Sequence, residues 1–139
     1  MLRSGSERRR ALTLLAILVA SIAPVGCDVL TGGCGDDLFD EPAALFTEGI
    51  TEDGTYVSSG WDPKELLDFP PGQKIEFVHG LGVVPASWQA YVATARKGDG
   101  SAIVLSTGDV ELVQIDEETI TVRNATCVDF YLLLTADAL

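Results

Sequence analysis

Short segments in which apolar and polar residues alternate follow one another from residue 54 to the end of the chain. The alternation is clearest near the end, where Val128, Phe130, Leu132 and Leu134 fall on one face. A period of two predicts β-strands with one buried face. The predicted strands cover residues 55–57, 74–78, 87–95, 102–105, 110–115, 119–123 and 128–134. We therefore expect an all-β fold, a small antiparallel β-sandwich of about six or seven strands, over residues 54–139.

The same alternation assigns side chains to faces. In residues 87–95, the face that carries Trp88 is expected in the core, and Tyr91 points the other way. In the last strand, Tyr131 and Leu133 occupy the second face. Because that face is also apolar, we expect it to be covered, either by the segment that precedes the domain or by a partner subunit.

The first 26 residues are organised like an export signal. Three arginines at residues 8–10 precede an apolar run at residues 11–23. A helix of this length spans about 20 Å, which is less than the ~30 Å of a bilayer core. We therefore predict a signal peptide at residues 1–26; the alternative is a signal that stays uncleaved and anchors the chain.

Residues 24–27, Pro-Val-Gly-Cys, resemble the bacterial lipobox, in which a small residue precedes a cysteine that becomes the lipidated N-terminus. The resemblance implies lipidation of Cys27, and two acyl chains give a stable membrane anchor. Pro24 departs from the pattern, since an aliphatic residue usually stands there. Asp28 resembles an inner-membrane retention signal. We expect a membrane-anchored protein of the bacterial cell envelope, with residues 27–53 as a flexible acidic tether.

The chain has three cysteines, Cys27, Cys34 and Cys127. If Cys27 carries lipid, the other two are left to pair in an oxidising compartment. This disulfide would close a loop of about 94 residues and stabilise the fold by about 4–5 kcal/mol in the chain-entropy model. The alternative is two free thiols, with Cys127 buried as a small apolar residue. No paired Cys/His spacing accompanies them, so no metal site is expected.

Charge narrows the range of partners. The chain carries 9 Lys and Arg against 21 Asp and Glu, a net charge of −12. Four of the basic residues and one acidic residue lie in residues 1–26, so the remainder carries −15. Such a surface repels phosphate backbones, which excludes a nucleic-acid partner. No motif indicates a cofactor.

One segment stands out, His-Gly-Leu-Gly-Val-Val-Pro at residues 79–85. It ends a predicted strand after His79 and turns at Gly80 and Gly82, which tolerate positive φ. It then begins the next strand after Pro85, which lacks the N–H needed for a ladder hydrogen bond. We expect these residues to be structural.

This segment resembles the His-Gly-Leu-Gly-x-x-Pro segment of small β-sandwich domains in phage tail fibres. There, a Thr-rich strand and an aromatic terminal strand follow, as at residues 119–124 and 130–131 here. The layout of residues 54–137 is also similar to H-type lectin domains. These resemblances imply a β-sandwich, a role in binding or adhesion, and a homotrimer. They transfer no sugar-binding residue, because the loops concerned do not align.

The candidate functional side chains are few. Trp61 lies in a Gly/Asp/Pro-rich loop and Tyr91 on an outward strand face; such aromatic rings stack on sugars, so both are candidate ligand-binding residues. His79 is the only histidine. Because no nucleophile or acid stands in a recognisable pattern, we favour a hydrogen-bonded structural role for it and predict no catalytic residue.

Together these features indicate an exported lipoprotein whose β-sandwich binds without catalysis. The partner is a glycan or, in the alternative, another envelope protein recognised through a sheet edge or through the face of Tyr131 and Leu133. A small hydrolase that depends on His79 is the third hypothesis.

Overall fold

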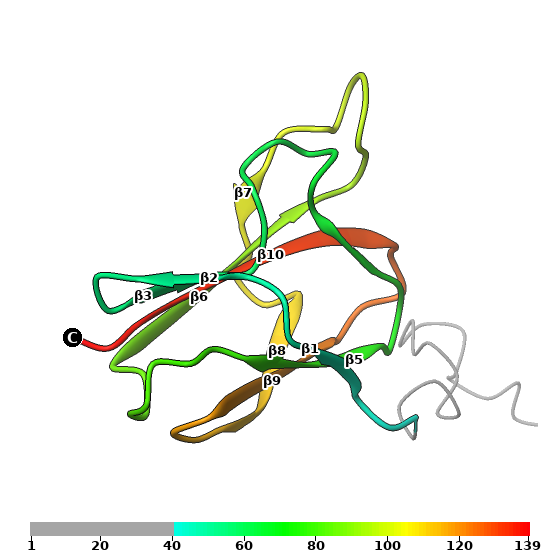
Figure 1. Cartoon of the computed structure of the whole chain (residues 1–139). Helices are drawn as coiled ribbons and strands as arrows, with labels where there is room; N and C mark the ends of the chain where they lie inside the picture. The colour runs from blue at the N-terminus through cyan, green and yellow to red at the C-terminus, as the bar shows by residue number, and fades with distance from the viewer. Residues whose placement is uncertain (1–40) are drawn as a thin grey trace, which may run out of the picture. The chain divides into compact units, whose positions relative to one another are not determined.

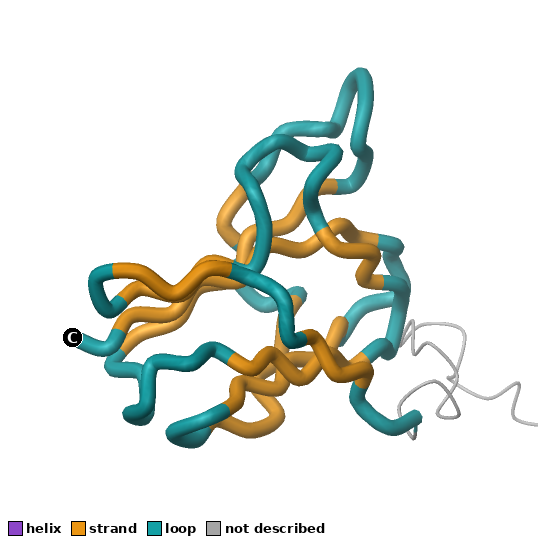
Figure 2. The backbone as a smooth tube through the Cα atoms, viewed as in Figure 1, coloured by secondary structure: helices purple, strands orange, loops and turns teal. Residues whose placement is uncertain are grey.

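The computed structural model describes residues 41–139, which form two β-sheets packed face to face and contain no helix (Figures 1 and 2). The strands are β1 Ala44–Phe46, β2 Ile50–Glu52, β3 Thr55–Val57, β4 Leu67–Phe69, β5 Lys74–Val78, β6 Ser87–Ala93, β7 Val104–Leu105, β8 Val110–Ile115, β9 Thr119–Asn124 and β10 Phe130–Asp137. The predicted all-β sandwich is therefore confirmed, with ten strands rather than six or seven.

One sheet has the order β1-β5-β9-β8, in which β1 and β5 are parallel and the other pairs antiparallel. The six-stranded sheet is built around β10. Along one edge β10 pairs with β6. Along the other edge it pairs with β4 at its beginning and with β3 at its end. The chain between β3 and β4, residues 58–66, therefore leaves the sheet as a long loop, and this loop carries Trp61.

The core lies between the sheets and contains the side chains that the alternation assigned to it. Leu132 and Leu134 of β10, Phe77 of β5, and Ile120 and Val122 of β9 are completely buried there. Full burial of such a side chain is worth about 1.5–3 kcal/mol, so these strands supply much of the stability of the fold.

A β-bulge explains an irregular period in β8. The register with β9 shifts between Leu112 and Gln114, which leaves Val113 exposed. An extra residue in one strand reverses the alternation beyond it. As a result Val110, Leu112 and Ile115, rather than residues at a strict spacing of two, pack against the core.

Three expectations about strands were wrong. The tether was expected to reach residue 53, but β1 and β2 already belong to the sheets. These edge strands are mostly exposed, so they show no apolar alternation in the sequence. Val128 precedes β10 and is exposed, because the strand begins only at Phe130. Residues 102–105 do not form a buried run: Val104 and Leu105 lie on an exposed edge strand.

The second face of β10 is covered by the chain itself. Leu133 is 0% exposed and packs with Leu66 from the loop after β3 and with Ala93 at the end of β6. Ile103, in the loop of residues 94–103, adds to the cover. In Figure 1 both loops lie beyond the six-stranded sheet, away from β5 and β9. The prediction that a tether or a partner subunit covers this face was therefore wrong, because two loops of the same domain cover it.

Arg96 connects these two loops. Its Nη2 donates to the carbonyl oxygen of Leu66 at 3.0 Å and to Oδ1 of Asp68 at 2.9 Å. Its guanidinium lies 4.5 Å from the centroid of the Tyr131 ring. A cation placed over an aromatic face is attracted by the ring. Tyr131 is thus half-buried under Arg96, and neither it nor Leu133 is a freely exposed apolar surface.

The segment that carries the tail-fibre resemblance is a turn between β5 and β6 in which His79 and Pro85 are buried and most of the residues between them are exposed. The Nδ1 atom of His79 accepts from the backbone N–H of Leu81 at 3.2 Å, and Nε2 lies 3.2 Å from the carbonyl oxygen of Asp116. This pattern fits a neutral ring protonated on Nε2. Gly80 and Gly82 have φ of 63° and 71°, where side chains are strained. His79 is therefore buried and hydrogen-bonded to the backbone, and Pro85 is buried just before β6.

A buried asparagine fixes the loop before β10. The Nδ2 of Asn124 donates to the carbonyl oxygens of Phe69 and Val128, at 2.8 and 2.9 Å. Its Oδ1 accepts from the backbone N–H and from the hydroxyl of Thr126. Every hydrogen-bonding group of this side chain is used, as burial requires. Asn124, the last residue of the Thr-rich strand, thus connects the end of β4 to the loop before β10.

The predictions for the N-terminal region concern residues outside the described part of the chain. These are the signal peptide, the lipidation of Cys27 and the participation of Cys34 in a disulfide. Cys127 is described and is exposed in the loop between β9 and β10, which contradicts the alternative of a buried apolar cysteine. No helix within residues 41–139 is long and apolar enough to cross a membrane.

Candidate functional site

The two aromatic residues singled out from the sequence lie against each other. The ring centroids of Trp61 and Tyr91 are 4.8 Å apart, and their planes meet at 71°. An edge-to-face pair of this kind is worth about 0.5–1.5 kcal/mol beyond the burial of its area. Tyr91 is held in turn by Gln89, whose Oε1 accepts from the tyrosine hydroxyl. Trp61 remains 54% exposed.

A short turn holds Trp61 at this position. The N–H of Glu65 donates to the carbonyl oxygen of Asp62 at 2.8 Å, and the N–H of Lys64 donates to Oδ1 of Asp62 at 3.0 Å. Leu66 then anchors the end of the loop against Leu133. The part of the loop that follows the indole is therefore fixed by the turn and by an apolar anchor.

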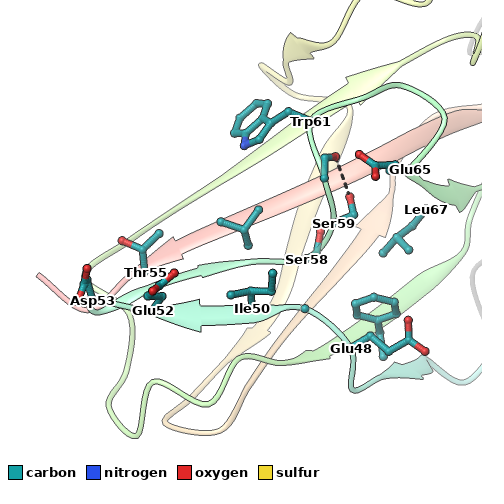
Figure 3. A pocket seen from close by; sticks show the side chains of 14 residues that line it. Glu48, Ile50, Glu52, Asp53, Thr55, Ser58, Ser59, Trp61, Glu65 and Leu67 are labelled. Carbon is teal, nitrogen blue, oxygen red and sulfur yellow. Dashed lines mark hydrogen bonds between the residues drawn. The ribbon is translucent and has the colours of Figure 1, made fainter.

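A pocket of about 670 Å³ lies below Trp61, along the hairpin of β2 and β3 (Figure 3). Its apolar lining comes from Phe46, Ile50, Val57, Trp61 and Leu67. Its polar lining comes from three hydroxyl residues and four acids: Thr55, Ser58, Ser59, Glu48, Glu52, Asp53 and Glu65. Apolar walls combined with a few polar groups are typical of small-molecule sites.

The end of the pocket near Glu48 is shaped by a buried tyrosine. The hydroxyl of Tyr56 donates to the carbonyl oxygen of Glu48 at 3.0 Å. Burial raises the pKa of Tyr56, so the phenol stays protonated and keeps this hydrogen bond. Gly49 has φ of 121°, and a Cβ atom there would lie 2.7 Å from the Tyr56 ring. The backbone can therefore close over Tyr56 only with glycine at this position.

His79 and the two serines of the pocket have backbone groups as their hydrogen-bond partners. His79 does not line the pocket, it is 0% exposed, and both of its ring nitrogens face backbone partners. Of the serines in the pocket, the hydroxyl oxygen of Ser58 accepts from the N–H of Leu134 at 2.9 Å, and the hydroxyl of Ser59 lies 3.4 Å from the carbonyl oxygen of Gly60. The described lining contains no histidine or lysine that could activate either hydroxyl.

The carboxylate of Asp116, in the turn between β8 and β9, differs from the carboxylates of the pocket in its hydrogen bonds to the backbone. Asp116 caps the β8–β9 turn by accepting from the N–H groups of Thr119 and Glu118, which lowers its pKa. Among the described residues, the only backbone N–H that contacts a carboxylate of the pocket is that of Asp62, which lies 3.4 Å from Oε2 of Glu65. Within residues 41–139, no group of three or more His, Cys, Asp or Glu side chains is placed to hold a metal ion.

Sequence reasoning found the aromatic pair but missed the acids of the pocket. Glu48, Glu52 and Asp53 fall in the segment that was expected to be a tether, where acidic residues indicate only solvation. What brings them to Trp61 is the pairing of β2 with β3, and no local pattern signals that pairing. Comparisons with family models, curated proteins and solved structures found no match to this chain.

Proposed function

We propose that this protein is a non-catalytic binding protein of the bacterial cell envelope, and that its β-sandwich holds a saccharide in the pocket beside Trp61. The observation that carries the proposal is the half-exposed indole, braced by Tyr91, at the border of a pocket with hydroxyl and carboxylate groups. Sugar rings offer an apolar C–H face to an aromatic ring and hydroxyl groups to carboxylates. Both kinds of group are present here on adjacent segments.

The alternative is an assembly role through another envelope protein. One of its two expected surfaces, the face of Tyr131 and Leu133, is covered by the loops described above. A sheet edge such as β8, with Val113 exposed, is what supports this alternative. The saccharide proposal has the stronger support, because it uses a formed pocket.

Replacing Trp61 with alanine is expected to weaken saccharide binding by about thirtyfold, since an aromatic anchor typically contributes about 2 kcal/mol. The full-length chain, purified in detergent, would be screened on a glycan array, and the affinity for a bound glycan measured by calorimetry. Val104→Ala, on an exposed edge away from the pocket, is the matched control and is expected to bind like the wild type. A protein that binds no glycan, or one whose binding survives Trp61→Ala, contradicts the proposal.

The location in the envelope is a further part of the proposal, and it predicts a specific mass. The chain extracted from membranes is expected to begin at Cys27 with two acyl chains attached, and to take up alkylating agent at Cys34 and Cys127 only after reduction. Intact-mass spectrometry with and without reductant measures both. An unmodified Cys27 would contradict the lipoprotein assignment, and two thiols that alkylate without reduction would contradict the disulfide.

A further inference from the structure

The charge of the pocket points to a narrower class of ligand. We propose that the pocket binds a saccharide with a free amino group, whose ammonium lies beside Glu65 while the C–H face of the sugar packs on Trp61. This inference rests on the proposed function, since it specifies which saccharide that same pocket takes.

The first argument is the proximity of a carboxylate to the aromatic ring. The side chain of Glu65 folds back over the backbone before Trp61: a Cβ atom at Gly60 would lie 1.9 Å from Oε2 of Glu65. Figure 3 shows Glu65 and Trp61 on the same loop beside the pocket, with the indole pointing away from the carboxylate in this view. An ammonium group is stabilised both by a carboxylate, in a charge-assisted hydrogen bond, and by an aromatic face. A saccharide in this pocket can therefore present an ammonium group to Glu65 and a separate C–H face to Trp61.

The second argument is the sign of the charge around the pocket. All the charged residues that line it are acids: Glu48, Glu52, Asp53 and Glu65. Among residues 41–139, the observed ion pairs are Arg96–Asp68 and Arg123–Glu111, and neither neutralises these acids. A uronic or sialic acid would therefore be repelled, whereas an amino sugar gains from the same field.

The test compares two probes on the same sugar backbone, one with free ammonium groups and one with uncharged acetamide groups. The full-length chain in detergent is titrated with a tetrasaccharide of β-1,4-linked glucosamine and with its N-acetylated form, by calorimetry at low and at high salt. The glucosamine form is expected to bind at least about tenfold more tightly, and salt is expected to reduce the difference. Glu65→Gln is expected to remove most of the preference, whereas Glu117→Gln, in the exposed β8–β9 turn, keeps it.

The outcomes separate this inference from the proposed function. Equal binding of the two probes, or an unchanged preference in Glu65→Gln, overturns the amino-sugar inference and leaves saccharide binding in place. An equal loss of preference in Glu65→Gln and Glu117→Gln also overturns it, because it reveals only attraction to overall negative charge. If neither probe binds and the glycan array is blank, the proposed function fails as well.

Discussion

Replacing Leu133 with alanine is expected to lower the free energy of unfolding by about 2–5 kcal/mol, although this residue faces away from the core between the sheets. Its side chain is 0% exposed and contacts Leu66 and Ala93, so truncation leaves a cavity under the loop that carries Trp61. Urea denaturation measures the loss. The same variant is expected to weaken ligand binding, since Leu66 anchors one end of that loop.

Two further measurements make this prediction specific. Val128→Ala, at an exposed position, is the control and is expected to change the free energy of unfolding by less than about 0.5 kcal/mol. Because loops of the same chain cover Leu133, the destabilisation caused by Leu133→Ala is expected to be the same at all protein concentrations. A destabilisation that changes with protein concentration would show that association with a partner subunit contributes to the cover of this face instead.

Replacing His79 with alanine is expected to destabilise the fold by about 3–5 kcal/mol. The change leaves the N–H of Leu81 and the carbonyl of Asp116 without their partner and empties a fully buried volume. The Tyr56 ring, whose centroid lies 6.5 Å from the imidazole, loses a neighbour as well. Thermal or urea denaturation measures the effect, with the exposed neighbour Val78 replaced by alanine as the control.

The same variant separates a structural from a catalytic histidine. Where His79→Ala is still folded, at low temperature, ligand affinity is expected to stay close to that of the wild type, because His79 does not line the pocket. A variant of unchanged stability would contradict the structural role. A hydrolytic activity that disappears with His79 would revive the enzyme hypothesis.

The sequence predicted the parts of the fold in which burial alternates along one strand. Ile75 and Phe77, Ile120 and Val122, and the centre of β10 are all examples, since each strand has one face in the core. It did not predict β1 and β2, because edge strands with exposed side chains carry no such pattern. The sequence also led to the prediction that a tether or a partner subunit covers Leu133. No local pattern shows that residues 58–66 fold over this face.

The sequence also predicted only part of the candidate site, namely its two aromatic residues. Composition and strand phase were enough to single out Trp61 and Tyr91, and the structure brings them together. Their contact depends on the loop between β3 and β4, whose path is set by Leu66 and by the bonds of Arg96. These are contacts between distant residues, and an alternation pattern records only neighbours within a strand.

The most direct test of the account is an NMR titration that follows the two tryptophan indoles of the chain. Trp61 borders the pocket and Trp88 packs against the core, so one reports on the site and the other is an internal control. On addition of the saccharide identified by the array, the indole N–H signal of Trp61, assigned through Trp61→Phe, is expected to shift while that of Trp88 stays in place. Binding that leaves the Trp61 signal unmoved would place the ligand elsewhere and contradict the account.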